Sequence, residues 1–454
     1  MKIINPATDE LISDIAEDTR EQITAKYDKL KLGQKEWASR SLPERISIIS
    51  RYAELVKENI EELAQALTME MGKPIRQSRG EINGAGGRIT FFVNNAEKYL
   101  GEEEMSNGNG MRELIRHEAL GVIGNISAWN YPYNVGYNVF IPALLAGNAV
   151  LYKPSEFATL TGLKIRDLLW KAGVPETAFE IVVGTGQAGQ VMLELPLDGY
   201  FFTGSYKTGR YIAETVAKKL VPIGLELGGK DPVYVTENIP DVKAAAQGIA
   251  DGAFYNNGQS CCAVERIYVH EKIYDEFVNH FTAEVQTFVA GNPADEATYS
   301  GAISRSAQLD VLEEQIQDAS QKGAKILTGG KRIDKPGNWF ENTVLVNVNH
   351  DMSVMREESF GPVIGIMKVN GDEEAVSLMS DTEYGLTSAI YTTDTERAEK
   401  LSAQLNSGTV YWNCCDRVSA NVPWSGRGNS GLGSTLSYQG IRAFTQPKAY
   451  HIRS

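Results

Sequence analysis

The stretch VIGNISAWNYPYNVGYNVFIPALLAGNAVLYKPS, residues 122–155, contains the repeating unit from which the fold can be predicted. A strand-like apolar segment comes first, a helical segment ends at Gly147, and a second strand-like segment follows. The alternation continues through the helix LTGLKIRDLLWKAG, the strand FEIVVG, the helix AGQVMLELP, the strand GYFFTGS and the helix KTGRYIAETVAKKL. This order predicts a parallel sheet with helices on both faces.

Segments on both sides of this unit extend the same fold class. Three helical runs precede it, at residues 19–37, 43–70 and 74–99, and a Gly- and Asn-rich break follows them. The second half alternates again, with PVYV, a helix at 241–254, ERIYVH, and helices at 271–290 and 305–323. We therefore expect two α/β units and a terminal strand in QPKAYHIRS.

Length, composition and charge exclude some classes of protein. A chain of 454 residues predicts two or three domains, and 42% hydrophobic with 22% charged residues is typical of a globular protein. The net charge of −14 argues against nucleic acid as a partner, because phosphate binding needs clustered Lys and Arg. We find neither a signal peptide nor an apolar run of about 18 residues. The sequence therefore predicts a cytoplasmic protein without a membrane partner.

Cysteine usage gives the first indication of chemistry. The four cysteines form two adjacent pairs, Cys261 with Cys262 and Cys414 with Cys415. Adjacent pairs suit neither a disulfide framework nor the C-x-x-C spacing of a metal site, and the five histidines are scattered. The sequence therefore predicts no metal centre, no histidine-based triad and a reducing compartment.

Three loops at strand ends are candidates for ligand binding. Residues 184–189, GTGQAG, match G-x-G-x-x-G, but the next strand ends in FFTGS and not in an acidic residue. Residues 202–209, FTGSYKTG, also join a strand to a helix, where Ser205 can cap the helix or contact a phosphate oxygen. In YKPSE, Lys153 and Glu156 lie beyond a strand's carboxyl end. Each segment, taken alone, also fits an ordinary loop.

Three further residues suit acyl-transfer chemistry. Glu226 lies between two leucines, and burial there would raise its pKa and suit it to general-base work. Asn130 can donate to an oxyanion or hold an aromatic turn. Cys261 follows a glycine turn that can present its thiol and its backbone N–H to one substrate atom. A surface pair of Glu226 with Lys230 remains the alternative for the carboxylate.

Seven short motifs follow one another along the chain: AWNYP, YKPSE, FTGSYKTG, LELGGKDP, NNGQSCCAVER, EESFGPV and GTVYWN. Together they resemble the non-acylating aldehyde dehydrogenase superfamily over nearly the whole chain. The resemblance implies an α/β fold with a Rossmann-type dinucleotide-binding domain (1–99 and 119–226), an α/β catalytic domain (227–432) and a small β oligomerisation element (100–118 and 433–454). It also implies a homodimer or homotetramer.

The resemblance assigns roles to the acyl-transfer residues. Cys261 would attack the aldehyde carbon, and Asn130 and the backbone N–H of Cys261 would hold the oxyanion. Hydride transfer from this thiohemiacetal to a nicotinamide would leave a thioester, and water activated by Glu226 would hydrolyse it to the carboxylic acid. Cys414 and Cys415 would be packing or pocket-wall residues.

The implied cofactor is NAD, with NADP as a weaker alternative, because the carboxylate of Glu156 would repel a 2′-phosphate. The FTGS loop would hold the pyrophosphate, and the loop at Gly184 would lie nearer the adenine. The residues implied for cofactor binding are Trp129, Lys153, Ser155, Glu156, Gly186, Gly204, Ser205, Glu358 and Phe360.

Some positions depart from the family pattern. Val139 stands in place of a frequent lysine, and Thr435 stands where a glutamate of a proposed proton relay is common. The N-terminal segment INPATDEL implies that the opening strand pair of longer members is missing. These departures concern the proton relay and the N-terminus and leave the acyl-transfer residues intact.

The implied substrate tunnel leaves the aldehyde open. Its walls would be Tyr131, Asn134, Asn138, Ser260, Cys262, Arg417, Val418 and Trp424. Tyr131 and Trp424 fit part of the aromatic cage used for betaine aldehyde or aminoaldehydes, although Asn138 occupies its third place. Arg417 can instead pair with the carboxylate of a semialdehyde such as succinic semialdehyde.

A medium-chain or aromatic aldehyde is the substrate that we favour at this point. A thiol esterase or acyltransferase is the alternative from another class. It would use the same cysteine, glutamate and amide without the cofactor-binding residues.

Overall fold

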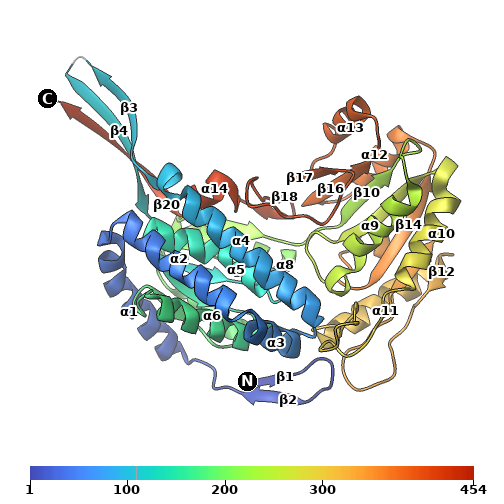
Figure 1. Ribbon diagram of the computed structural model, residues 1–454, viewed down its shortest axis with the longest axis horizontal. Helices are drawn as coiled ribbons and strands as arrows, with labels where there is room; N and C mark the ends of the chain where they lie inside the picture. The colour runs from blue at the N-terminus through green and yellow to red at the C-terminus, as the bar shows by residue number, and fades with distance from the viewer. Residues whose placement is uncertain (109, 454) are drawn as a thin grey trace.

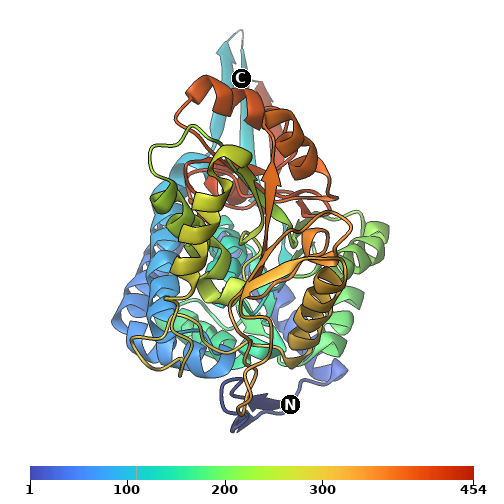
Figure 2. The same ribbon diagram turned by 90° about the vertical axis from the view of Figure 1, so that its right-hand side faces the viewer.

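A computed structural model describes residues 1–108 and 110–453 as two α/β lobes with a projecting β arm (Figure 1). Each lobe is built on one predominantly parallel sheet. Figures 1 and 2 show the arm, which contains the C-terminal strand, far from the N-terminal segment. The predicted α/β fold class is confirmed.

The first sheet has six strands in the order β19-β9-β8-β5-β6-β7. The strands β5 to β9 pair in parallel, and β19 is antiparallel to β9. The bounds are β5 (Val122–Ile126), β6 (Ala149–Lys153), β7 (Phe179–Ile181), β8 (Gly199–Thr203), β9 (Ile223–Glu226) and β19 (Gly431–Leu432). Because parallel strands end at the same edge, Lys153, Thr203 and Glu226 are carried to one side of the sheet.

Helices cover both faces of the first sheet. Buried residues of α1, α7 and α8 pack with Val122 and Leu151, and those of α2 to α6 pack with Ile123 and Val150 on the opposite face. The helices are α1 (Arg20–Ser39), α2 (Leu42–Glu58), α3 (Ile60–Met71), α4 (Ile75–Leu100), α5 (Pro132–Ala146), α6 (Thr159–Ala172), α7 (Gly186–Glu194) and α8 (Tyr206–Val216).

The run predicted as one helix at 43–70 is two helices. α2 ends at Glu58 and α3 begins at Ile60, and Asn59 between them has φ −114° and ψ 16°. The Asn59 amide Nδ2 donates to the Leu55 carbonyl at 2.7 Å, so the side chain satisfies a carbonyl at the end of α2. Asparagine favours such ends because its amide competes for backbone groups.

The second sheet has seven strands in the order β12-β13-β14-β11-β10-β16-β17, all parallel except β12 against β13. Val233 and Val235 pack toward α9 and α10, and Tyr234 packs toward α11, α12 and α13. The strands are β10 (Asp231–Val235), β11 (Val264–His270), β12 (Lys325–Thr328), β13 (Thr343–Val346), β14 (Val363–Val369), β16 (Thr387–Tyr391) and β17 (Thr409–Trp412). The helices are α9 (Val242–Phe254), α10 (Tyr274–Val285), α11 (Ser306–Gln321), α12 (Asp372–Ser380) and α13 (Thr395–Ser402).

The arm is a three-stranded antiparallel sheet in the order β20-β4-β3. It contains β3 (Glu103–Gly108), β4 (Met111–Ala119) and β20 (Thr445–Arg453), and α14 (Ser437–Arg442) leads into it. The use of this arm to join copies of the chain, and the domain division, stay predictions.

Two short strand pairs complete the fold, β1 (Lys2–Ile4) with β2 (Leu11–Asp14) and β15 (Tyr384–Gly385) with β18 (Arg427–Gly428). The N-terminal segment that contains INPATDEL forms a strand pair of its own, in which Lys2 pairs with Asp14 and Ile3 with Ser13. Within residues 1–108 and 110–453, no helix is long and apolar enough to cross a membrane.

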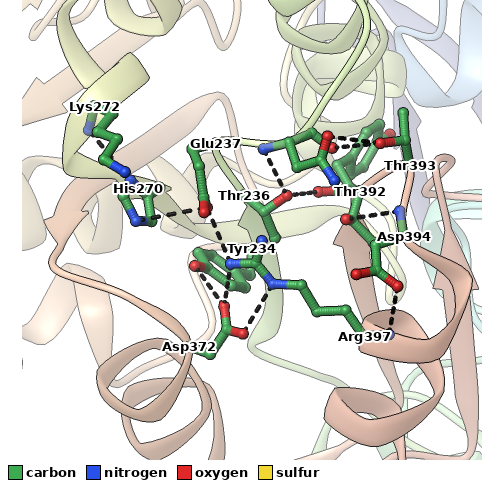
Figure 3. Close-up of polar contacts among 12 residues, drawn as sticks. Tyr234, Thr236, Glu237, His270, Lys272, Asp372, Thr392, Thr393, Asp394 and Arg397 are labelled. Carbon is green, nitrogen blue, oxygen red and sulfur yellow. Dashed lines mark hydrogen bonds and ion pairs between the residues drawn. The ribbon is translucent and has the colours of Figure 1, made fainter.

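A charged cluster lies at the carboxyl edge of the second sheet (Figure 3). Arg397 Nε lies 2.8 Å from Asp372 Oδ2, and its Nη2 lies 2.6 Å from Asp372 Oδ1 and 3.0 Å from Glu237 Oε2. The Tyr234 hydroxyl donates to Asp372 at 3.0 Å, and His270 Nε2 lies 3.5 Å from Glu237. These groups satisfy one another, so the cluster ties α12 and α13 to the end of β10.

Arg397→Ala should lower the free energy of unfolding by about 2 kcal/mol, because Asp372 loses a bidentate partner and Glu237 loses a single ion-pair contact. Arg397→Lys should recover part of the loss. Urea denaturation followed by circular dichroism measures both variants. The control is Arg210→Ala, which breaks an exposed pair with Glu214 and should not change the midpoint. An Arg397→Ala midpoint equal to that of the control would contradict the role of the cluster.

Candidate active site

A cleft of about 790 Å³ follows the carboxyl edge of the first sheet. Every residue expected to bind the cofactor lines it: Trp129, Lys153, Ser155, Glu156, Gly186, Gly204, Ser205, Glu358 and Phe360. Most of them come from loops that follow the strands β5, β6 and β8. The structure therefore brings these sequence motifs together along one cleft, where open α/β sheets bind ligands.

The FTGS loop lines the cleft at the start of α8. The Ser205 hydroxyl accepts from the Thr208 N–H at 3.4 Å and caps the helix. A Cβ on Gly204 would lie 2.5 Å from the Phe202 ring, so a side chain here would displace that ring. The unpaired N–H groups of a helix N-terminus attract anions, so this place suits a pyrophosphate.

Lys153 and Glu156 lie at one end of the same cleft. Lys153 Nζ donates to the Pro154 carbonyl at 3.1 Å and lies 3.9 Å from the Glu156 carboxylate. Burial lowers the pKa of Lys153, and the charge of Glu156 opposes that shift. The glycine loop after β7 also lines the cleft, since Gly189 lies against the Lys153 side chain. A lysine and a carboxylate side by side suit the hydroxyl groups of a ribose.

Glu358 and Phe360 line the cleft from the second lobe. Glu358 Oε1 accepts from the Gly229 N–H at 3.0 Å. Burial, and then the nearby charge of Glu265, raise the pKa of Glu358 to about 8. Glu265 also accepts from the backbone N–H of Phe360 at 3.0 Å, so one buried carboxylate orders the backbone that carries both residues.

Cys261 is, within the described residues, the one side chain that lines both this cleft and a second cavity of about 480 Å³. It follows the 3-10 turn Tyr255–Gly258, in which three residues have positive φ. Asn256 Nδ2 donates to the Gln259 carbonyl at 3.1 Å and to the Asn130 carbonyl at 3.3 Å. These bonds oppose the strain of the left-handed backbone and hold Cys261 at the boundary of the two cavities.

Asn130 lies beside the Cys261 loop, in the turn that begins α5. Its amide Nδ2 donates to the Gln259 carbonyl at 3.2 Å, so one amide N–H stays free for another acceptor. Lys73 Nζ donates to the Asn130 carbonyl at 2.7 Å and is ion-paired with Glu81. This pair has no exposed side-chain surface, so it fixes the turn from inside the protein.

Glu226, the last residue of β9, lines the cofactor cleft. Burial raises its pKa to about 8. The Thr435 hydroxyl donates to Glu226 Oε1 at 2.8 Å, and among the described residues nothing bonds to Oε2. An oriented carboxylate with one free oxygen and a raised pKa has the properties of a general base.

Most residues expected in the substrate tunnel line the second cavity: Tyr131, Asn134, Asn138, Ser260, Cys262, Val418 and Trp424. The expectation for Arg417 is corrected. Its backbone N–H donates to the Tyr411 hydroxyl at 3.3 Å, the same hydroxyl donates to its carbonyl, and its side chain is exposed. Asp416, its neighbour, lines the cavity instead.

The sequence does not indicate four polar residues of this cavity: Glu81, Arg88, Tyr255 and Asp416. Arg88 lies on α4, whose amphipathic pattern is that of any packed helix and gives no signal. Asp416 directly follows the Cys414 and Cys415 pair, and that proximity was the one local signal available. The Lys73 and Glu81 pair was also missed, because only tertiary packing brings it to Asn130.

The comparisons with known proteins agree with this geometry. The model of the aldehyde dehydrogenase family matches residues 1–450. The chain is 34% identical over 446 residues to an NADP(+) succinate-semialdehyde dehydrogenase of Deinococcus radiodurans, covering 98% of this chain and 93% of the relative. It is 34% identical over 457 residues to the peroxisomal aminoaldehyde dehydrogenase 1 of Pisum sativum, covering 98% and 91%.

Among solved structures, the betaine aldehyde dehydrogenase of Staphylococcus aureus in complex with NAD+ matches with a TM-score of 0.95. It is 30% identical, and the match covers 100% of this chain and 92% of that chain. The fold, the cleft and the cysteine between two cavities define an oxidoreductase with an NAD-binding fold. The chain belongs to the aldehyde dehydrogenase family.

Replacement of Glu226 should have a pH-dependent effect on stability. The folded-state pKa of about 8 lies above the usual value of 4.5, so the folded protein binds a proton that the unfolded chain releases. This contribution to stability is present below about pH 4.5 and is lost as the pH rises to about 8. Glu226→Gln should therefore melt at a higher temperature than the wild type at about pH 9, and at nearly the same temperature at about pH 5.

Differential scanning fluorimetry at both pH values measures the two melting temperatures. Glu214→Gln, at an exposed carboxylate, serves as the control and should show no such dependence. A Glu226→Gln difference that is the same at both pH values would contradict the buried, protonated state of Glu226.

Proposed function

We propose that the protein oxidises an aldehyde to a carboxylic acid with NAD as the electron acceptor. The position of Cys261 carries the proposal, because its side chain lines the dinucleotide-sized cleft and the second cavity together. An aldehyde bound covalently to that sulfur would have its reacting carbon beside the cleft. An esterase would not need a cleft lined by Lys153, Ser205 and Glu358.

The first step joins Cys261 Sγ to the carbonyl carbon, and the carbonyl oxygen becomes negatively charged. The free N–H of the Asn130 amide and the backbone N–H of Cys261 are the donors for that oxygen. Cys262 is unsuited to this attack. Its thiol donates to Asp416 Oδ1 at 3.1 Å, and a hydrogen bond with Cys261 together with burial raises its pKa well above the usual value.

NAD, when bound in the cleft, supplies the two-electron acceptor. With such an acceptor bound, the adduct carbon would lose its hydrogen with two electrons, the oxyanion would return to a carbonyl, and a thioester would remain on Cys261. Glu226 then takes a proton from water through its free Oε2, and the oxygen of that water attacks the thioester carbon. The C–S bond breaks, the acid leaves, and the Cys261 thiolate is regenerated.

Thr435 orients the base through its bond to Oε1 but cannot itself hold the proton as a carboxylate can. Val139, in place of a frequent lysine, is buried. With Val139 and Thr435 at these positions, Thr435 orients the Glu226 carboxylate and burial raises its pKa.

We propose NAD over NADP because Glu156 lies where the adenosine ribose would bind. Its carboxylate lies 3.9 Å from Lys153 Nζ, and the Ser155 hydroxyl donates to it at 3.4 Å. A 2′-phosphate would meet this carboxylate in the same place, and like charges at close range repel.

Glu156→Gln should raise kcat/KM for NADP about tenfold, because the repulsion is removed while the hydrogen-bonding shape is kept. The value for NAD should fall only slightly. Initial rates of reduced cofactor formation with each cofactor measure the ratio. The control is Glu176→Gln, an exposed carboxylate outside the cleft. An unchanged NADP to NAD ratio in Glu156→Gln would contradict this origin of the preference.

The proposed nucleophile is tested with single cysteine variants. Cys261→Ala should lose aldehyde oxidation by at least about a thousandfold, whereas Cys262→Ala should keep a substantial part of the activity. NADH formation at about pH 8 measures both, and mass spectrometry of a trapped acyl-enzyme checks its site. Equal losses in the two variants, or an acyl group on Cys262, would contradict the assignment. The absence of any aldehyde oxidation in the wild type would overturn the proposed function.

The three substrate classes expected from the sequence differ in charge. Lys73 Nζ lies 3.9 Å from the centre of the Tyr131 ring, so one face of the expected cage residue already contacts a cation. A medium-chain or aromatic aldehyde would complement Tyr131, Val418 and Trp424. It would not complement the charged side chains of the same cavity. The charge of the substrate is therefore the property that distinguishes the neutral, anionic and cationic aldehydes at this site.

A further inference from the structure

Three carboxylate or guanidinium side chains line the second cavity, namely Glu81, Arg88 and Asp416. Glu81 is neutralised by its buried ion pair with Lys73. Arg88 and Asp416 form no ion pair with each other or with another of the described residues. The cavity wall thus carries one unpaired guanidinium and one unpaired carboxylate.

Arg88 keeps donors for a ligand. Its Nη1 donates to the Asn134 carbonyl at 3.1 Å and to Asn138 Oδ1 at 2.9 Å, and both acceptors are neutral. These bonds hold the guanidinium in place between α4 and α5. Its Nε and Nη2 have no hydrogen-bond partner among the described residues, and that edge of a guanidinium is the one that binds a carboxylate with two parallel bonds.

Asp416 keeps an acceptor for a ligand. Its Oδ1 accepts from the Cys262 thiol at 3.1 Å, and Ser260 is a second hydrogen-bonding neighbour. A carboxylate has about four lone-pair sites, so these two neighbours leave it acceptor capacity for a ligand. The turn that carries it is fixed, because Asp416 has a φ of 47° and Cys415 is bonded to the Tyr391 hydroxyl. Tyr131 and Trp424 line the same cavity and are suited to a cation as well.

A substrate in this cavity must bind the charged groups of both Arg88 and Asp416. Otherwise at least one of these groups loses its water without gaining a partner. A neutral aldehyde would exclude water from Arg88 and Asp416 and replace it with nothing polar. A purely anionic semialdehyde would pair with Arg88 but meet Asp416 as a like charge. A purely cationic aminoaldehyde would have the reverse problem. Only a group with both charges satisfies the two side chains together.

Resting on the proposed aldehyde oxidation, we infer that the substrate is an amino-acid semialdehyde, with its carboxylate bound by Arg88 and its ammonium group bound by Asp416. The cavity volume of about 480 Å³ lies in the range of small-molecule sites and is ample for such a molecule. The aldehyde end reaches Cys261, which lines the same cavity. Reactions that consume the product would therefore act on an amino dicarboxylic acid.

Four aldehydes of equal chain length test the inference: α-aminoadipic semialdehyde, adipic semialdehyde, ω-aminohexanal and hexanal. Each is assayed by NADH formation, with the free aldehyde concentration measured. The wild type should have its highest kcat/KM for the zwitterion, about a hundredfold above hexanal, because a site built for polar groups rejects analogues that lack them. A kcat/KM for hexanal equal to or above that for the zwitterion would overturn the inference.

Two variants separate the two charges. Arg88→Gln should lower the ratio of kcat/KM for adipic semialdehyde over hexanal by about tenfold or more, and Asp416→Asn should do the same for ω-aminohexanal over hexanal. Arg417→Gln is the matched control, because Arg417 neighbours Asp416 but lies outside the cavity, and it should leave both ratios unchanged. Variants that lower the rates of all four aldehydes equally would show a structural role and overturn the inference.

Binding of the reaction products gives a readout that is independent of turnover. Isothermal titration calorimetry of the wild type should find α-aminoadipate binding more tightly than adipate, ω-aminohexanoate and hexanoate, and Arg88→Gln should abolish its advantage over ω-aminohexanoate. A tighter complex with hexanoate would overturn the inference even where a variant is inactive. Lack of turnover with every aldehyde would instead count against the proposed function. In that case the order of affinities for the four product acids would still test whether the cavity recognises both charges.

Discussion

The buried ion pair of Lys73 and Glu81 is the constraint on which the geometry of the site depends. Both side chains are fully enclosed, and removal of one partner from such a pair typically costs about 3–5 kcal/mol because the other charge is left uncompensated. The pair is tolerated because each ion has further partners. Lys73 donates to the Asn130 carbonyl, and Glu81 accepts from the Tyr133 N–H at 3.0 Å.

This pair joins α4 to the two segments that carry Asn130 and Cys261, the residues proposed to hold the oxyanion and to attack the aldehyde. It links α4 to the turn that begins α5, and Asn256 of the cysteine loop donates to the same Asn130 carbonyl. The contacts of the Asn130 backbone carbonyl therefore fix this residue relative to the cysteine loop. They also fix the free N–H of its side-chain amide relative to Cys261. A donor that is fixed before the reaction needs no reorganisation when the oxyanion forms, which is the condition for effective electrostatic catalysis.

The sequence predicted the parts of the fold and site that depend on local pattern. The alternation of strands and helices, the strand ends that carry Lys153 and Glu226, and the cap at Ser205 all arise from neighbouring residues. The prediction of one helical run at 43–70 is wrong at its centre, because the helical spacing of apolar residues continues through Asn59, where α2 ends and α3 begins. Arg88 and Asp416 could not be predicted, since only tertiary packing brings α4 and the turn after β17 to one cavity. Arg417 is expected in the tunnel and Asp416 is not, because nothing local indicates which of two adjacent side chains faces inward.

A short linker joins the two lobes. It contains two glycines because its backbone lies close to the Glu358 carboxylate. Glu226 ends β9 in the first lobe and Asp231 begins β10 in the second, so the chain has only residues 227–230 for the crossing. A Cβ on Gly228 would lie 2.2 Å from the Glu358 carboxylate, and the next residue, Gly229, donates its N–H to that carboxylate. Glu226, the proposed base, and Glu358, the carboxylate proposed for the cofactor site, are thus held by one stretch of backbone.

Different parts of the fold hold the residues proposed for the reaction and the charged residues proposed for substrate selection. Cys261, Asn130 and Glu226 are each positioned by backbone contacts or by the end of a sheet strand, so their geometry depends on the framework of both lobes. The charges of the second cavity come from one helix surface and one turn, and neither lies in the motifs that carry the reaction. The inference that Arg88 and Asp416 select the substrate therefore predicts that their exchange changes which aldehyde is bound, while Cys261, Asn130 and Glu226 keep their places. This separation explains why family motifs identify the reaction from sequence alone, whereas the substrate has to be inferred from the packing of side chains around the cavity.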